Sequence, residues 1–204
     1  MKNKEILEKI KKMPSTERRN IKQEDLMKLI NLLTVEEIVE LSNIIGYPVF
    51  TRMCMGPLQH KFVLLQDGAA AIIVNDKDEI LLQSRADNEK WGLPGGCQEL
   101  GERLEDTMIR EVKEETNLTI TEENLEFVTI VSGNTRKNVY PNGDVVYNNT
   151  ALFCVKNYQG EIEKDYESKE LKFFALNHLP KNQNDSDLIE VYKNWLQNKS
   201  KYEN

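Results

Sequence analysis

The chain has 204 residues, of which 39% are hydrophobic and 30% are charged, so it is long enough for one medium-sized domain, or for one domain with a helical appendage. Its 34 acidic residues outnumber its 27 lysines and arginines, giving a net charge of −7. This balance argues against general affinity for nucleic acid or anionic membranes, because both attract an excess of cationic side chains. Three widely spaced cysteines exclude a disulfide framework, and two histidines without ligand spacing exclude a structural zinc site.

The N-terminal residues carry charges too frequently for a signal peptide, and no apolar run is long enough for a membrane span. We therefore expect a soluble, cytoplasmic protein. Residues 1–57 are predicted to be helical, because apolar residues recur at helical spacing. Thr34 and Glu37 fit a capping box, and Gly46 is the expected helix stop. Two X-Pro pairs, Tyr47-Pro48 and Gly56-Pro57, interrupt the pattern, which places a domain boundary near residue 57.

Residues 58–204 show a pattern of strands with two helices. Turn residues at 75–78 predict a hairpin over 69–85. A glycine-rich loop at 91–101 precedes a predicted helix at about 103–116, and an amphipathic helix is predicted at 185–198. These elements indicate an α+β domain with helices packed on a mixed sheet. The remaining predicted strands are 62–65, 127–132, 145–155 and 171–176.

Three glutamates in the first of these two helices share one side. Glu111, Glu114 and Glu115 are spaced so that they span an arc of roughly 100° beside the apolar face. Unpaired, they would repel one another, and acidic runs of this kind are commonly a solvated surface. A divalent cation would turn the repulsion into coordination, because Mg²⁺ prefers carboxylate, carbonyl and water oxygens.

The complete sequence motif from Gly96 to Leu118 favours a cation site over a solvated acidic surface. It resembles the Nudix box, G-x5-E-x7-R-E-U-x-E-E-x-G-U with U apolar, at eight of nine specified positions. The exception is Asn117 in place of the last glycine, at the expected end of the helix. A left-handed conformation is needed there, and asparagine tolerates it better than most residues. A signature of this length is far more specific than a short glycine motif.

The resemblance covers about residues 60–180 and implies a Nudix-type α/β/α sandwich with a mixed sheet, preceded by the small helical segment. It further implies a hydrolase that uses Mg²⁺ or Mn²⁺ to cleave the diphosphate bond of a nucleoside diphosphate linked to another group, or of a nucleoside triphosphate. The expected partner is therefore a nucleotide-type small molecule, with neither nucleic acid nor membrane. Markers of particular Nudix subfamilies are missing, so the substrate stays open.

Residue roles implied by the resemblance centre on the helix. Arg110 is expected to orient the glutamates by ion pairing, and Glu111 is a candidate general base. Glu102 is expected to support the loop or to hold a further metal through water. The expected metal ligands are Gly95 (or Gly96) through its carbonyl, Glu111, Glu114 and Glu115.

Further candidates lie outside the box. Many family members take another carboxylate from the loop before the last strand, where Glu167 is favoured as ligand or base and Glu170 is the alternative. Trp91 is expected to anchor the glycine loop rather than to stack on a base. A long polar loop at 133–144 is a candidate for substrate recognition. The substrate-binding candidates are Arg85, Arg136 and Tyr140.

Two interpretations of residues 1–57 remain. In the first, the chain is a Nudix-fold nucleotide sensor or regulator whose helical segment is an interaction module for DNA. The best candidate recognition helix, at 34–45, carries Glu36, Glu37 and Glu40 but no lysine or arginine, so phosphates would repel it. In the second, apolar stripes on these helices cover a partner surface, which makes a homodimer possible.

Overall fold

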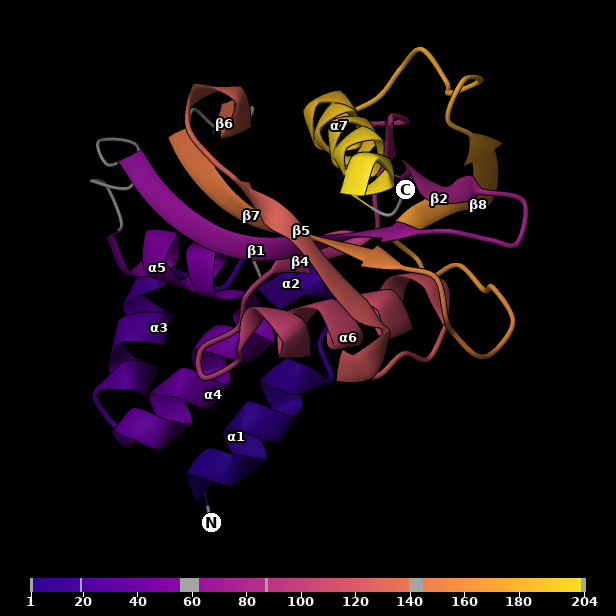
Figure 1. Cartoon of the computed structure of the whole chain (residues 1–204). Helices are drawn as coiled ribbons and strands as arrows, with labels where there is room; N and C mark the ends of the chain where they lie inside the picture. The colour runs from indigo at the N-terminus through magenta and orange to yellow at the C-terminus, as the bar shows by residue number, and fades with distance from the viewer. Residues whose placement is uncertain (1, 19, 56–62, 87, 140–144, 203–204) are drawn as a thin grey trace. The chain divides into compact units, whose positions relative to one another are not determined.

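The computed structural model describes residues 2–18, 20–55, 63–86, 88–139 and 145–202 (Figure 1). The chain forms two compact units, one built mainly from the residues before 65 and the other from most of the rest. The predicted boundary near residue 57 lies outside the described residues. Within the described part, no helix is both long and apolar enough to cross a membrane.

The N-terminal unit is helical, as predicted. Thr34 and Glu37 form the expected capping box, since Glu37 N–H donates to Thr34 Oγ1 at 3.3 Å and Thr34 N–H donates to Glu37 Oε2 at 3.0 Å. Gly46 ends that helix with a φ of 89°. The helices are α1 (Lys2–Lys11), α2 (Ser15–Arg18), α3 (Gln23–Ile30), α4 (Val35–Ile45) and α5 (Tyr47–Met55).

Helix α5 was not expected from the sequence, because Tyr47-Pro48 was interpreted as an interruption. Proline is compatible with the first turn of a helix, where its missing N–H has no partner to lose. The new helix follows Gly46 directly, and Phe50 N–H donates to Gly46 O at 2.9 Å. This unit has a hydrophobic core of its own, made by Leu7, Ile10, Leu26, Leu41, Ile45 and Phe50.

The second unit is built on two β-sheets. The larger has the order β4-β1-β7-β5 with β6 on β7, and the smaller has the order β3-β2-β8. The strands are β1 (Val63–Ile73), β2 (Glu79–Arg85), β3 (Trp91–Gly92), β4 (Gly95–Cys97), β5 (Leu125–Val131), β6 (Lys137–Val139), β7 (Val145–Val155) and β8 (Ser168–Ala175). Short 3-10 turns cover Glu122–Asn124 and Asn134–Arg136.

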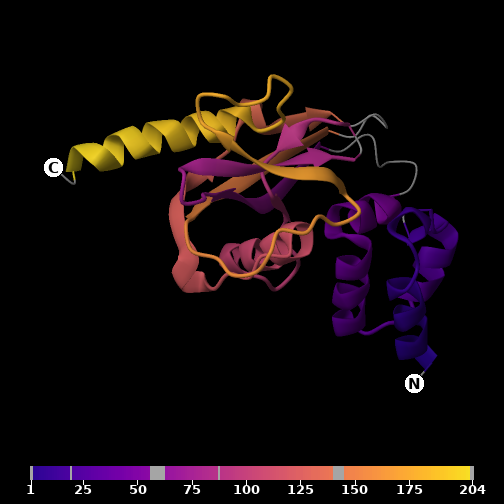
Figure 2. The same ribbon diagram turned by 90° about the vertical axis from the view of Figure 1, so that its right-hand side faces the viewer.

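Helices α6 (Leu104–Thr116) and α7 (Ser186–Tyr202) lie on opposite sides of the strands (Figures 1 and 2). Alternate residues of β1 face the two helices: Ala71 belongs to the core under α6, and Ile72 to the core under α7. The two hydrophobic cores therefore lie on either side of the sheets, which confirms the α/β/α sandwich expected from the sequence.

The predicted hairpin over residues 69–85 forms at its turn but not along its whole length. Asn75 N–H donates to Glu79 O at 3.0 Å, and Val74 bridges Ile80. Beyond this bridge, β1 joins the larger sheet and β2 the smaller one. The apolar runs at 62–65 and 69–74 were expected to be separate; the structure has one strand, β1, through Gln66–Gly68.

Candidate active site

The glycine-rich segment predicted as a loop over 91–101 contains two short strands, β3 with Gly92 and β4 with Gly95 and Gly96. Strand β4 pairs with β1 so that Ala69 is opposite Gly96 and Ala70 is opposite Gly95. A Cβ on Gly95 would lie 2.8 Å from the Cα of Ala70. A Cβ on Gly96 would lie 2.5 Å from the Cδ of Glu111. At Gly95 the backbone of β1 therefore leaves no room for a side chain, and at Gly96 the absence of a side chain lets the Glu111 carboxylate lie directly against β4.

Helix α6 carries the glutamates and ends where the sequence predicted. Asn117 has a φ of 61°, the left-handed conformation expected of it, and its N–H donates to Lys113 O at 3.1 Å. Lys113 Nζ in turn donates to Asn117 Oδ1 at 2.8 Å. The departure from the Nudix box at this position therefore leaves the helix end intact.

Glu115 is buried, with 5% of its surface exposed. Its Oε2 accepts hydrogen bonds from Gly95 N–H at 2.7 Å and from Gln83 Nε2 at 3.0 Å. Burial, followed by the nearby charge of Glu111, raises the pKa of Glu115 to about 8, although these hydrogen bonds and the charge of Arg85 oppose the shift. At neutral pH this carboxyl holds its proton unless a cation offsets its charge.

Arg110 joins the carboxylates of the site. It donates to Glu102 through Nε at 2.7 Å and to Glu111 through one terminal nitrogen at 2.6 Å. The same nitrogen reaches Glu114 at 3.2 Å, while the other reaches the carbonyl of Cys97 at 3.0 Å. Because a guanidinium has several donors in a rigid plane, one side chain fixes three carboxylates and the glycine strand.

Glu111 is largely enclosed, and burial raises its pKa despite the ion pair with Arg110. The charges of Glu114 and Glu167 raise it further, which places both carboxylates close to Glu111. Glu167 comes from the end of the loop before β8, so the structure brings this predicted site residue to the helix. Glu170, the alternative, is an exposed residue of β8 opposite Ser84.

The donor types fit a hard divalent cation, because Glu111, Glu114 and Glu115 place carboxylate oxygens along one side of α6. The charge of Glu111 raises the pKa of Glu115, a repulsion that a cation would relieve. In the described residues, no three acidic, histidine or cysteine side chains form a ready-made metal cluster. Glu111 and Glu114 contact the same nitrogen of Arg110, Glu111 through Oε1 and Glu114 through Oε2.

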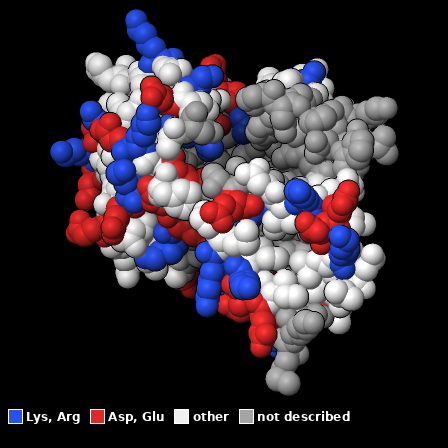
Figure 3. Space-filling view, turned by 180° about the vertical axis from the view of Figure 1, so that it is seen from behind, with Lys and Arg blue, Asp and Glu red and all other residues white. Residues whose placement is uncertain are grey.

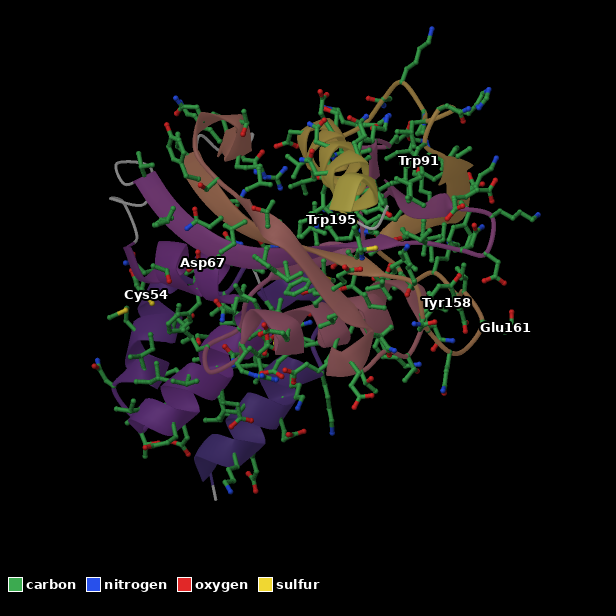
Figure 4. All side chains as sticks on the ribbon, viewed as in Figure 1. Cys54, Asp67, Trp91, Tyr158, Glu161 and Trp195 are labelled. Carbon is green, nitrogen blue, oxygen red and sulfur yellow. The ribbon has the colours of Figure 1, made fainter. Side chains whose placement is uncertain are left out.

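Arg85 ends strand β2, and its charge lowers the pKa of Glu115, which places it beside the acidic helix. Trp91, which is labelled in Figure 4, packs edge-on against Phe174 of β8, with ring centroids 4.9 Å apart. Its backbone N–H donates to Asn182 O at 2.9 Å. These contacts agree with the expectation that Trp91 anchors the loop.

Arg136 is 13% exposed and lies at the N-terminus of α7. It forms ion pairs with Asp185 at 3.3 Å and Asp187 at 3.2 Å, and donates to Thr150 Oγ1 at 3.3 Å. Two carboxylates already compensate its charge, and a substrate contact for it stays a prediction. Tyr140, the other candidate from this loop, lies outside the described residues.

The sequence did not single out Gln83, Ser168 or Asp185. Gln83 and Ser168 are buried and hydrogen-bonded to each other at 2.7 Å, and Gln83 contacts Glu115. Asp185 Oδ2 accepts a hydrogen bond from Leu93 N–H at 3.0 Å, which ties the glycine loop to α7. A polar residue after the apolar run Ile80–Leu82 was the available signal for Gln83, but its partners are far away in the sequence.

An α/β/α sandwich with a glutamate-rich helix against a glycine strand defines the class of Nudix-fold proteins. The sequence profile of the NUDIX domain matches residues 64–195. The chain therefore belongs to the Nudix hydrolase family and is a hydrolase of diphosphate bonds; the family generally uses divalent metal ions. The residues before 64 lie outside the match.

Similar proteins support this assignment. The ADP-ribose pyrophosphatase of Methanocaldococcus jannaschii is 34% identical over 141 residues, 66% of this chain and 79% of that protein. The solved MutT NUDIX hydrolase from Burkholderia pseudomallei is 25% identical, with a TM-score of 0.53 over 62% of this chain and 97% of its own. The NUDIX domain of Shewanella oneidensis NrtR, solved with ADP ribose, shares the fold at 22% identity, with a TM-score of 0.53 over 67% and 91% of the two chains.

Proposed function

We propose that the protein is a pyrophosphohydrolase dependent on Mg²⁺ or Mn²⁺, and that it cleaves the diphosphate bond of a nucleoside diphosphate linked to another group, or of a nucleoside triphosphate. The observation that carries this proposal is the enclosed pair Glu111 and Glu115, which lies against the Gly95–Gly96 strand and has raised pKa values. Enclosing two carboxylates together lowers the stability of the folded protein, and such strained groups with shifted pKa values are typical of functional sites. Binding of a cation would offset their charge.

Hydrolysis adds one water molecule across a P–O–P bridge. The water oxygen bonds to one phosphorus, the bridging oxygen leaves with the other phosphate, and the water proton passes to a base and then to solvent. A bound divalent cation neutralises phosphate oxygens and lowers the pKa of the attacking water. Glu167 is exposed and near Glu111, so we assign it the role of ligand or proton acceptor. Arg85 adds a positive charge beside Glu115 for the phosphates.

ADP-ribose is the first substrate to test, because the relative from Methanocaldococcus jannaschii that matches 66% of this chain is an ADP-ribose pyrophosphatase. Cleavage of its diphosphate bond yields AMP and ribose 5-phosphate. Other sugar-linked and coenzyme-type nucleoside diphosphates, and nucleoside triphosphates, belong in the same screen. Each compound is assayed with Mg²⁺ and with Mn²⁺, and product formation is followed by chromatography.

The decisive variants are Glu111→Gln and Glu115→Gln, which remove a carboxylate while keeping its shape. Each is expected to lower kcat by several orders of magnitude with little change in circular dichroism. Glu105→Gln, on the first turn of the same helix, is the matched control and should retain activity. Near-normal turnover of a true substrate by both site variants would rule the proposal out.

A small-molecule substrate is also favoured over DNA by the distribution of charge. Helix α4, the candidate recognition helix, carries Glu36, Glu37 and Glu40. On the described part of the face in Figure 3, basic and acidic side chains are interspersed, without an unbroken basic surface. A DNA-binding regulator needs such a surface to displace counterions. A gel-shift titration at low salt is expected to show no complex; saturable binding would favour the regulator instead.

A further inference from the structure

Gln83 is a buried polar side chain that directly follows the apolar run of strand β2. It follows Ile80, Leu81 and Leu82 of β2, which are fully buried, and is itself only 1% exposed. Burying a side-chain amide costs free energy unless its hydrogen-bonding groups find partners. The packing of β2 alone gives no reason for a glutamine here, so its partners indicate what it does.

The partners of Gln83 fix the orientation of its amide. Its Nε2 donates to Glu115 Oε2 at 3.0 Å and to Leu93 O at 3.3 Å, while its Oε1 accepts from Ser168 Oγ at 2.7 Å. A carbonyl oxygen cannot donate, so the NH₂ group must face Leu93 and Glu115. The amide oxygen on the opposite side needs a hydrogen-bond donor, and the hydroxyl of Ser168 provides it.

Glu115 is held by one oxygen only. Within the described residues, both hydrogen bonds that it accepts, from Gln83 and from Gly95, end on Oε2. Its other oxygen, Oε1, accepts neither of these two bonds. The carboxylate plane is thus set by a side chain of β2 and by the backbone of β4, two elements of the rigid sandwich.

Ser168 fixes the orientation of the Gln83 amide, because its hydroxyl donates to Gln83 Oε1. It is 2% exposed and begins strand β8, where its N–H donates to Asp165 Oδ1 at 3.1 Å. The preceding residue, Glu167, is anchored in the same way, because its N–H also donates to Asp165 Oδ1 at 3.1 Å. In addition, its carbonyl accepts from Ala86 N–H at 2.7 Å. The hydrogen bonds that connect Glu115, Gln83 and Ser168 therefore reach the residue next to Glu167, the other carboxylate of the proposed site.

We infer that Gln83 is a positioning residue of the metal site: it holds Oε2 of Glu115 so that Oε1 is presented to the divalent cation, and Ser168 keeps the Gln83 amide in the required orientation. The inference rests on the proposed function, because it takes Glu115 as a ligand. Outer partners of metal ligands typically contribute ten- to a hundredfold in metal affinity or activity.

The test is a titration of the full-length protein with Mn²⁺ in the absence of substrate. The electron paramagnetic resonance signal of the free ion measures how much Mn²⁺ is bound. Gln83→Met keeps the length of the side chain but removes its three hydrogen bonds, to Glu115, Leu93 and Ser168. It is expected to raise the Mn²⁺ Kd by about tenfold or more. Ser168→Ala is expected to raise it by about threefold or more. In the Gln83→Met background, Ser168→Ala should add nothing, because the bond it removes is already lost.

Two matched controls separate positioning from general destabilisation. Leu82→Met alters the packing of the same strand, and Ser42→Ala removes another buried hydroxyl, whose Oγ donates to Val39 O at 2.7 Å in the N-terminal unit. Both should leave the Mn²⁺ Kd unchanged. A purely structural role for Gln83 predicts a lower Tm in EDTA with the Kd of the folded protein unchanged, and that result would overturn the inference.

Other combinations of results distinguish the role of Gln83 from that of Glu115. If Gln83→Met does not fold, Ser168→Ala decides alone, and an unchanged Kd refutes the inference. If Glu115→Gln abolishes Mn²⁺ binding but Gln83→Met does not weaken it, the proposed function stands and only the role of Gln83 fails. If Glu115→Gln binds Mn²⁺ normally, Glu115 is not a ligand and the proposed site fails together with the inference.

Discussion

Two glutamates of α6 hold their carboxylates in an enclosed region, where burial disfavours the charge of both and the charge of Glu111 also disfavours that of Glu115. Arg110 stabilises the charge of Glu111 through a 2.6 Å hydrogen bond, whereas Glu115 accepts from the neutral donors of Gln83 and Gly95 and is also stabilised by the charge of Arg85. The pKa of Glu115 is accordingly raised to about 8. Proton and cation therefore compete for the same carboxylate, and stability and metal affinity must both depend on pH.

The sign of the stability effect follows from the pKa of Glu115. The folded carboxyl has a pKa of about 8, against 4.5 for an ordinary glutamate, so between these values the folded protein binds more protons than the unfolded chain. The free energy of unfolding should therefore decrease as pH rises from about 4.5 to about 8 in EDTA. Urea unfolding at several pH values measures this pH dependence of the free energy of unfolding.

In Glu115→Gln this side chain no longer titrates, so the free energy of unfolding should decrease less steeply with pH. Some decrease should persist because the pKa of Glu111 is also raised. Glu105→Gln is the control and should keep the slope of the unmodified protein. With Mn²⁺ present, affinity should increase over the same pH range, because the cation displaces the proton. A stability that increases with pH in EDTA would contradict the raised pKa.

Gly96 offers a test of how closely Glu111 is packed. In Gly96→Ala, the added methyl group would lie 2.5 Å from Cδ of Glu111 and force that side chain to move. We expect a large loss of kcat with a much smaller loss of stability, because Glu111 can turn toward solvent. Cys97→Ser, at the next and exposed position, is the control and should retain activity. Full activity of Gly96→Ala would mean that Glu111 acts from another position.

At the scale of secondary-structure elements, the sequence predicted what depends on local spacing. Helical periodicity placed Glu111, Glu114 and Glu115 on one side of α6, and the structure has that helix. The bonds of Gln83 to Glu115 and Ser168 were not predictable, because they depend on how β2 pairs with β8 and packs against α6. Helix α5 was missed for a local reason: an X-Pro pair fits a helix start as well as a loop.

The end of α6 depends on a left-handed residue. Asn117→Ala should destabilise the protein by about 1 kcal/mol or more. The left-handed φ of 61° is sterically unfavourable for alanine, and the hydrogen bond from Lys113 Nζ to the asparagine side chain is lost. Asn117→Gly also loses that bond, but it relieves the backbone cost and should destabilise less. Urea unfolding of both variants gives the comparison. Equal destabilisation would show that the side-chain bonds, rather than the backbone conformation, make asparagine suitable here.

At the scale of the whole molecule, each unit has its own hydrophobic core. The core of residues 1–57 centres on residues such as Leu26 and Leu41, whereas the NUDIX match begins at residue 64 and contains both cores of the sandwich. The acidic site lies entirely in the second unit. The helical segment is thus not needed to build the proposed site, and its exposed apolar residues Leu32 and Val35 leave partner binding as its proposed role.

Deletion of residues 1–57 separates these roles. The remaining chain, 58–204, retains α6, β2, β4 and β8, so we expect its Mn²⁺ Kd to stay within about twofold of that of the full-length protein. If the helical segment mediates a homodimer, the full-length protein should have twice the monomer mass by light scattering and the deletion variant the monomer mass. An oligomeric state unchanged by the deletion would refute dimerisation through the segment, and loss of Mn²⁺ binding by folded 58–204 would show that the site needs the helices after all.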